Sequence, residues 1–167
     1  AHSLYGKKKN VVEDFGFETI FLGTFSKALG SFGGYIVGNS IIIDHLRNFA
    51  KSAIYTTALP PATLAANLES LNIISKKDLS KKTLKNAKYL CELLGVKFTE
   101  SAIIIVEIDD VKKTLEISEK LKQQGFLVSA IRPPTSPTAR LRITVNTKHK
   151  KKEIEKFAKS LNSILQF

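Results

Sequence analysis

The chain has 167 residues, of which 43% are hydrophobic, and this length and composition predict a globular protein of one domain or of parts of two. Its net charge is +11, but the lysine runs lie in loops and at helix starts along the whole chain. Because these lysines form no single basic face and few of the basic residues are arginine, we expect no nucleic-acid partner. No apolar run has the length of a membrane span, so we expect no membrane partner.

The cysteine and methionine content bears on location and on the extent of the chain. The single cysteine, Cys91, cannot form an internal disulfide, and its leucine neighbours favour a core position over a reactive thiol. We therefore expect a reducing, cytoplasmic compartment. The sequence starts at Ala1 and contains no methionine, and we expect it to be a piece of a longer protein.

Two strands and two helices are predicted in the first part of the chain. Apolar runs predict a buried strand over residues 17–22 and a second strand over residues 35–37. Asn39 and Ser40 form a predicted N-cap, and apolar residues follow it at helical spacing. A further helix is predicted to start at the proline pair of residues 60–61, because proline is acceptable in a first turn.

The pattern changes near Lys76, where we predict a domain boundary between residues 1–75 and 76–167. Beyond it, Ser80 is predicted to cap a helix that ends at Gly95. A helix after Asp110 is predicted to face Val111, Leu115 and Leu121 inward. Strands are predicted over residues 96–98, 102–108, 126–131 and 141–145, and the clearest helical stripe comprises Ile154, Phe157, Ala158, Leu161, Ile164 and Leu165. Strands that alternate with helices predict an α/β or α+β fold in which helices cover a sheet.

The segment Gly-Thr-Phe-Ser-Lys-Ala-Leu-Gly, residues 23–30, places Lys27 at the end of the first predicted strand. Hydroxyl-bearing residues and glycines lie on both sides of it. Desolvation at the end of a buried strand makes a lysine amine a usable nucleophile or Schiff-base former. The alternative is an ordinary solvent-exposed charge where the strand emerges into water.

Four segments in this order resemble the pyridoxal-phosphate (PLP)-dependent α-oxoamine synthases, and together they cover essentially the whole chain. Residues 23–30 resemble the cofactor-lysine motif of that family, and Ala1-His2-Ser3 resembles the tail of its Asp-Glu-Ala-His motif. Tyr-Thr-Thr-Ala-Leu-Pro-Pro, residues 55–61, resembles the segment that reaches across the dimer. Arg-Pro-Pro-Thr followed by Arg-Leu-Arg, within residues 131–144, resembles the strand that binds the substrate carboxylate.

The resemblance implies the aspartate-aminotransferase-like fold, fold type I of the PLP-dependent transferases. Residues 1–75 would be the C-terminal part of the PLP-binding large domain, and residues 76–167 a small α+β domain. It also implies a homodimer with shared active sites. The acidic partner of the cofactor's pyridine nitrogen would lie before Ala1, so we expect this chain by itself to have little or no activity.

The resemblance also implies roles for single residues around the cofactor. Lys27 would form the Schiff base with PLP and then carry protons, and the Thr24 hydroxyl would bind the cofactor phosphate. His2 would donate a hydrogen bond to the phenolic oxygen of PLP. Thr56 and Thr57 would contact the phosphate of the partner subunit's cofactor, with Thr57 favoured over Thr56. Apart from Lys27, each of these side chains can instead be an ordinary structural residue of its strand or turn.

Two arginines would bind substrate. Arg140 and Arg142 alternate with Leu141, so both are expected on one face of a strand. A planar guanidinium suits bidentate capture of a carboxylate, and the resemblance favours Arg142 for that role, with Arg140 as a supporting or surface charge. The loop at residues 137–139 is shorter than is usual in the family. No metal site is expected.

The resemblance is strongest to family members that condense L-alanine with a pimeloyl thioester, carried by coenzyme A (CoA) or acyl carrier protein (ACP), in biotin synthesis. Sister synthases that use glycine or serine stay as alternatives within the family. Outside this family, the net positive charge is also consistent with a different function, that of a non-catalytic basic binding module.

Overall fold

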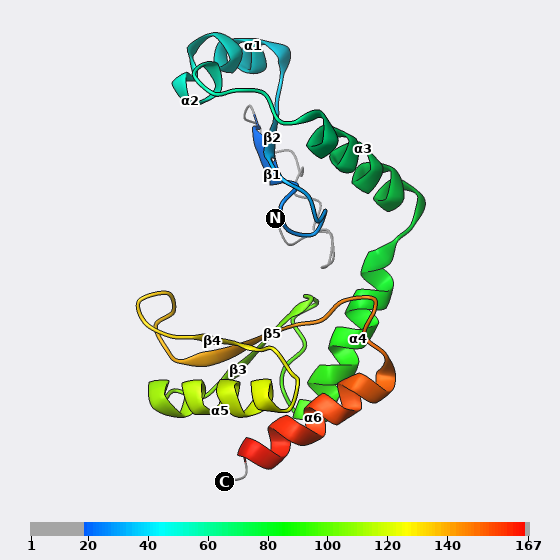
Figure 1. Ribbon diagram of the computed structural model, residues 1–167, viewed down its shortest axis with the longest axis vertical. Coiled ribbons are helices and arrows are strands. Elements are labelled where there is room, and N and C mark those ends of the chain that lie inside the picture. The colour runs from blue at the N-terminus through cyan, green and yellow to red at the C-terminus, as the bar shows by residue number, and fades with distance from the viewer. Residues whose placement is uncertain (1–18, 166–167) are drawn as a thin grey trace. The chain divides into compact units, whose positions relative to one another are not determined.

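The computed structural model describes residues 19–165 and divides into two units between Asp78 and Leu79 (Figure 1). The first contains β1, β2, α1, α2 and α3, and the second contains α4, β3, α5, β4, β5 and α6. Among the described residues, no helix combines the length and the apolar composition that crossing a membrane requires.

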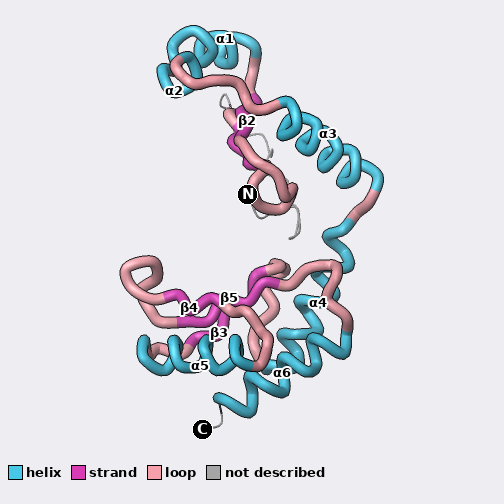
Figure 2. The backbone as a smooth tube through the Cα atoms, viewed as in Figure 1, coloured by secondary structure: helices cyan, strands magenta, loops and turns pink. Residues whose placement is uncertain are grey.

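The first unit begins with an antiparallel pair of short strands (Figure 2). β1 (Phe21–Thr24) pairs with β2 (Gly34–Val37) in a register that places Thr24 opposite Gly34. The loop of residues 25–33 between the strands is closed by its own backbone: the Phe25 amide donates to the Gly33 carbonyl at 2.9 Å, and the Ser31 amide donates to the Phe25 carbonyl at 2.9 Å. Gly33 has φ +105°, a conformation that residues with a Cβ rarely adopt.

Three helices complete the first unit. α1 (Ser40–Phe49) is capped as predicted, since the Asn39 side chain accepts a hydrogen bond from the Ile42 amide at 2.8 Å. The short α2 (Lys51–Ile54) follows directly. α3 (Pro61–Lys76) starts at the second proline of the pair, where a missing amide donor costs no intrahelical hydrogen bond.

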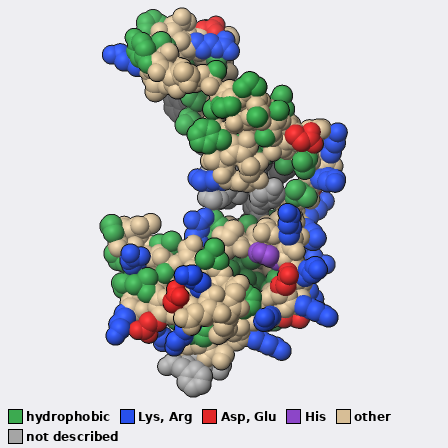
Figure 3. Space-filling model, viewed as in Figure 1, with side chains coloured by type: hydrophobic (Ala, Val, Ile, Leu, Met, Phe, Trp, Pro, Cys, Tyr) green, Lys and Arg blue, Asp and Glu red, His purple; other side chains and the backbone are tan. Residues whose placement is uncertain are grey.

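The prediction that the first strand is buried is wrong for its described residues. The Leu22 side chain is 77% exposed, and Ile36 and Val37 of β2 are exposed as well. Among the strands that the structure describes, β1 and β2 pair only with each other, so each has one strand neighbour. Figure 3 shows hydrophobic side chains at the surface of this unit. Among its described residues, Leu29 and Asn67 alone are buried.

The second unit is an antiparallel sheet with helices on one face (Figure 1). Its strand order is β3-β5-β4, so the last strand in sequence lies in the centre. The strands and helices are β3 (Ile103–Glu107), β4 (Ser129–Ile131), β5 (Arg140–Thr144), α4 (Leu79–Leu94), α5 (Val111–Gln123) and α6 (Lys151–Leu165).

Several boundaries and one helix face differ from the prediction. α4 begins at Leu79, so Ser80 lies inside it, and residues 96–98 form no strand. In α5 the buried residues are Thr114, Ile117 and Leu121, whereas Val111 and Leu115 are exposed. The buried face of α5 is therefore rotated relative to the face that the sequence predicted. Asp110 caps the helix, because its side chain accepts a hydrogen bond from the Lys113 amide at 2.7 Å.

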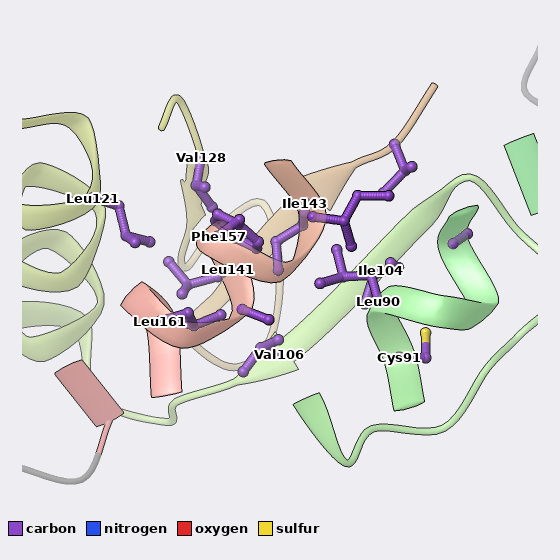
Figure 4. Close-up of a cluster of buried hydrophobic side chains, with 14 of the residues drawn as sticks. Leu90, Cys91, Ile104, Val106, Leu121, Val128, Leu141, Ile143, Phe157 and Leu161 are labelled. Carbon is purple, nitrogen blue, oxygen red and sulfur yellow. The ribbon is translucent and has the colours of Figure 1, made fainter. Parts of the chain in front are cut away.

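The core of the second unit follows from strand alternation (Figure 4). Ile104 and Val106 of β3, with Leu141 and Ile143 of β5, are buried together with side chains of the helices. The α6 stripe is confirmed, with Ile154, Phe157, Ala158 and Leu161 buried. Cys91 is also in this core, and burial raises the pKa of its thiol, which suits a packing residue better than a reactive one.

Replacement of Leu161 by alanine tests this core. Because Leu161 is 0% exposed, we expect Leu161→Ala to lower the free energy of unfolding of the second unit by about 2–5 kcal/mol, measured by urea denaturation. Leu127→Ala is the matched control, since Leu127 is 91% exposed and its truncation should change stability by less than about 0.5 kcal/mol. Equal losses for both variants would contradict the described core.

Candidate functional site

The candidate site of the first unit is the turn that follows β1. The Thr24 hydroxyl lies at its centre: Oγ1 donates to the Gly33 carbonyl at 3.2 Å, accepts from the Ser26 amide at 3.1 Å and shares a 2.7 Å hydrogen bond with the Ser26 hydroxyl. Lys27 follows Ser26 in the sequence, and its carbonyl accepts a hydrogen bond from the Gly30 amide at 3.1 Å. The turn therefore places two hydroxyls and one primary amine within four consecutive residues.

Lys27 is exposed, and the desolvation that its strand-end position predicted is not found within the described part of the chain. Within residues 19–165, β1 and β2 form a two-stranded sheet, and no further described strand or helix covers the end of β1. The Lys27 side chain makes no hydrogen bond or ion pair with the described residues. Its amine is thus free to react with a carbonyl compound or to bind an anion.

α3 contacts the same turn from a distant part of the sequence. Asn67 Nδ2 donates to the Phe32 carbonyl at 3.2 Å, and Ser70 Oγ donates to the Leu29 carbonyl at 2.8 Å. Sequence reasoning missed both residues, and it also missed the bond that Ser26 makes to Thr24. Their spacing of three places both on one helix face, but other polar residues of α3 are spaced in the same way, so no sequence pattern singles these two out.

The remaining candidates of the first unit are less constrained. Thr56 and Thr57 are exposed in the segment between α2 and α3. Two residues later, Leu59 lies against Gly33, since a Cβ at Gly33 would come within 2.8 Å of Leu59 Cδ1. The segment that carries the two threonines therefore reaches the loop that carries Lys27. His2 lies outside the described residues.

The two arginine candidates belong to the second unit and differ in their surroundings. Both lie on the sheet face opposite Leu141 and Ile143, as the alternation predicted. Arg140 Nη1 forms a 3.1 Å ion pair with Glu107 Oε1, and Arg140 also donates to Thr138. Arg142 is half-buried and forms no ion pair with the described residues. Arg142 is therefore the guanidinium available to an external carboxylate.

The residues of the first turn fit PLP in their chemistry and in the close packing of the backbone. Its phosphate needs hydroxyl and amide donors, which Thr24 and Ser26 offer, and its aldehyde needs a free amine, which Lys27 offers. The backbone beside them leaves no room for larger residues: a Cβ at Gly23 would collide with the Tyr35 ring, and one at Gly34 would lie 3.3 Å from the Gly23 carbonyl oxygen. Within residues 19–165, no group of three His, Cys, Asp or Glu side chains could hold a metal ion.

Comparison with known proteins defines the class first. The pattern of the family described as aminotransferase class I and II matches residues 4–161. The chain belongs to this family. The 8-amino-7-oxononanoate synthase from Maricaulis maris is 44% identical over 148 residues, which are 87% of this chain and 38% of that protein. A putative 8-amino-7-oxononanoate synthase from Rippkaea orientalis is 41% identical over 162 residues, 93% of this chain and 42% of that protein.

The chain spans about two fifths of the length of these curated relatives. A solved structure of SPT with PLP internal aldimine matches with a TM-score of 0.82 and 25% identity, over 88% of this chain and 39% of that chain. The serine palmitoyltransferase from Sphingomonas wittichii matches with a TM-score of 0.81 and 27% identity, over 88% and 39% of the two chains. These matches confirm the resemblance and the fold-type-I, aminotransferase-like fold class expected from the sequence.

Replacement of Thr24 by valine tests the turn. Valine has a similar shape but lacks the hydroxyl that accepts from the Ser26 amide. Since one hydrogen bond contributes about 1 kcal/mol, we expect Thr24→Val to speed hydrogen exchange of the Ser26 amide by about fivefold, measured by NMR. Thr57→Val is the control, because the exposed Thr57 hydroxyl bonds to no described residue. Unchanged exchange in Thr24→Val would refute the described hydrogen bonding.

Proposed function

We propose that the protein carrying this sequence is a PLP-dependent acyltransferase. It condenses L-alanine with a pimeloyl thioester, bound to CoA or ACP, and releases carbon dioxide to give 8-amino-7-oxononanoate for biotin synthesis. The observation that carries the proposal is the Thr24–Lys27 turn, with its free amine and two hydroxyls, in a chain 44% identical to an 8-amino-7-oxononanoate synthase.

Lys27 is the residue to which we assign the chemistry. When bound, PLP supplies an aldehyde for the attachment of amines and an electron-withdrawing ring that stabilises a carbanion. Lys27 holds the cofactor through its amine, and, once the substrate amine has replaced it, removes and returns the proton at the substrate α-carbon. An amine without an ion-pair partner suits both tasks, because a neighbouring carboxylate stabilises the ammonium form, which has no lone pair to attack an aldehyde or to take up a proton.

The other proposed ligands bind and orient the cofactor. Thr24 turns its hydroxyl from the Gly33 carbonyl to donate to the phosphate, and the neighbouring Ser26 hydroxyl, which is exposed, donates as well. Thr57, or alternatively Thr56, contacts the phosphate of the partner subunit's cofactor. His2 donates to the phenolic oxygen. The assignments of Thr24, Thr56, Thr57 and His2 rest on the family motifs, whereas that of Ser26 rests on its hydrogen bonds to Thr24.

Arg142 is the proposed ligand of the amino-acid carboxylate. Its guanidinium can donate two parallel hydrogen bonds to one carboxylate, which fixes the orientation of the α-carbon. Arg140 does not compete for this role, because Glu107 already supplies a carboxylate to it. We assign Arg140 to the structure of the strand pair β3–β5.

A sister reaction is the second candidate, and the solved structures fit it as well. Serine palmitoyltransferases match the fold with TM-scores of 0.81 and 0.82. A serine-using enzyme would have the same cofactor lysine and carboxylate arginine, so these residues do not separate the two reactions. The identity of the consumed amino acid separates them.

The proposed assembly is a homodimer with shared sites. The exposed apolar side chains of the first unit, among them Leu22, Ile41 and Phe49, support an extensive contact surface, because patches of this kind are uncommon on isolated soluble proteins. Thr56 and Thr57 lie in an exposed segment, as a residue that serves a neighbouring subunit must.

Covalent labelling tests the assignment of Lys27. We expect stoichiometric PLP followed by borohydride to modify Lys27 in preference to the other lysines, mapped by peptide mass spectrometry. Lys27→Arg should abolish this modification, whereas Lys51→Ala, a replacement of another exposed lysine in the same unit, should leave it unchanged. Label spread evenly over the surface lysines, together with salt-sensitive binding to nucleic acid, would favour the basic binding module instead.

Replacement of the two arginines tests the carboxylate site. Since charge-assisted hydrogen bonds contribute about 1.5–3 kcal/mol, we expect Arg142→Gln to lower kcat/KM for L-alanine by roughly 10- to 100-fold, mainly through KM. Arg142→Lys should restore little, because an ammonium group cannot bind a carboxylate in the same two-pronged way. Arg140→Gln is the matched comparison, and an equal or larger loss there would reverse the assignment.

A further inference from the structure

We propose that Asn67 and Ser70 of α3 are positioning residues that hold the loop bearing Lys27 in the conformation needed for cofactor attachment. This inference rests on the proposed function, because it concerns the reactivity of Lys27 toward PLP. Neither residue belongs to the motifs that identify the family in this chain, and neither is placed in contact with the cofactor.

The first support is that the Lys27 side chain has no anchor of its own. It forms no hydrogen bond or ion pair with the described residues, so the position of its amine depends on the loop backbone. Hydrogen bonds within the loop close it at its base, between Phe25 and Gly33 and between Ser31 and Phe25. A further hydrogen bond, from the Gly30 amide to the Lys27 carbonyl, bends the chain next to Lys27 but does not join this part of the loop to another element.

α3 provides such a connection at two successive points. Ser70 Oγ donates to the Leu29 carbonyl at 2.8 Å, two residues after Lys27, and Asn67 Nδ2 donates to the Phe32 carbonyl at 3.2 Å. Because residues three apart lie on the same helix face, both donors approach the loop from one side. Each fixes a carbonyl that the β1–β2 hydrogen bonds leave unpaired.

The burial pattern of α3 supports a specific role for Asn67. The helix exposes Leu64 and Leu68 but buries Asn67, which is 6% exposed. The Oδ1 atom of Asn67 is buried without a hydrogen-bond partner among the described residues, an arrangement that costs stability. A buried leucine at this position would pack without such a cost, so stability alone does not explain why asparagine is present. The hydrogen bond that the asparagine amide donates to the loop does explain it.

α3 also connects the loop to the threonine segment. Leu59, just before the helix, lies against Gly33 at the end of the loop. The start of α3 therefore contacts the same loop that Asn67 and Ser70 hold farther along the helix. One rigid helix thus sets the loop conformation from Leu29 to Gly33, and with it the backbone position of Lys27.

The test uses variants that remove one donor at a time in the natural protein that carries this sequence. Ser70→Ala removes the hydroxyl, Ser70→Thr retains it, and Asn67→Asp keeps the size of the side chain while removing the amide donor. The matched controls are Asn72→Asp and Ser75→Ala on the same helix, where both side chains are exposed and bond only within α3.

Two readouts are needed, both below the unfolding temperature of every variant. The first is the rate at which Lys27 condenses with the PLP aldehyde with loss of water, trapped by borohydride reduction of the new C=N bond. The second is hydrogen exchange of the amides of residues 25–33. We expect Ser70→Ala and Asn67→Asp to slow attachment and to speed loop exchange by about fivefold or more, the effect of one lost hydrogen bond. Ser70→Thr should remain within about twofold of the parent.

The outcomes separate this proposal from the one on which it rests. If the unsubstituted protein attaches PLP to Lys27 but Ser70→Ala and Asn67→Asp match their controls, the positioning role is overturned and the proposed function stands. If the unsubstituted protein shows no preference for Lys27, both proposals are overturned. A general loss of stability without a change in the attachment rate would show that the two residues are structural only.

Discussion

The hydrogen bonds that hold the loop between β1 and β2 determine where Lys27 can present its amine. The side chain has no hydrogen bond or ion pair to a described residue, so its location is a property of the backbone. The Thr24 hydroxyl ties the start of the loop to its end through the Gly33 carbonyl, and the two donors of α3 reach it from 35 and 41 residues farther along the chain. A local motif contains the amine and the hydroxyls of the candidate site, and a distant helix donates hydrogen bonds to the loop that carries them.

Strand alternation in the second unit separates the packing residues of β5 from its two candidate carboxylate ligands. On β5, Leu141 and Ile143 enter the core, and the residues between them project from the opposite face. Glu107 on β3 pairs directly with Arg140 and satisfies its charge. Arg142, two residues farther along β5 and on the same face, has no such partner among the described residues. One strand therefore combines a structural arginine and an available one.

The sequence predicts well what depends on neighbours along the chain. The Asn39 cap, the start of α3 near its proline pair and the apolar stripe of α6 all follow from local rules, and all are confirmed. Burial is less predictable because it depends on distant elements. Leu22 lies in an apolar run but is exposed on a two-stranded sheet, and Val111 of α5 is exposed where Thr114 is buried.

In the candidate site, too, local sequence patterns predict some features, whereas others depend on distant parts of the chain. Lys27, Thr24 and the two arginines are recognisable from motifs, and the strand alternation of the arginines is confirmed. The exposure of Lys27 and the different surroundings of Arg140 and Arg142 required the structure. Asn67 and Ser70 carry no signal in their own neighbourhood, because their partners are carbonyl groups far away in sequence.

Product identification tests the central claim most directly. The natural protein that carries this sequence is incubated with PLP, a pimeloyl thioester and L-alanine labelled with different isotopes at the carboxyl carbon and the α-carbon. Mass spectrometry should find 8-amino-7-oxononanoate that retains the α-carbon label, and the carboxyl label should appear in carbon dioxide. Consumption of glycine or serine in place of alanine would contradict the assigned reaction, and the absence of any amino-ketone product from the three amino acids would contradict the assigned class.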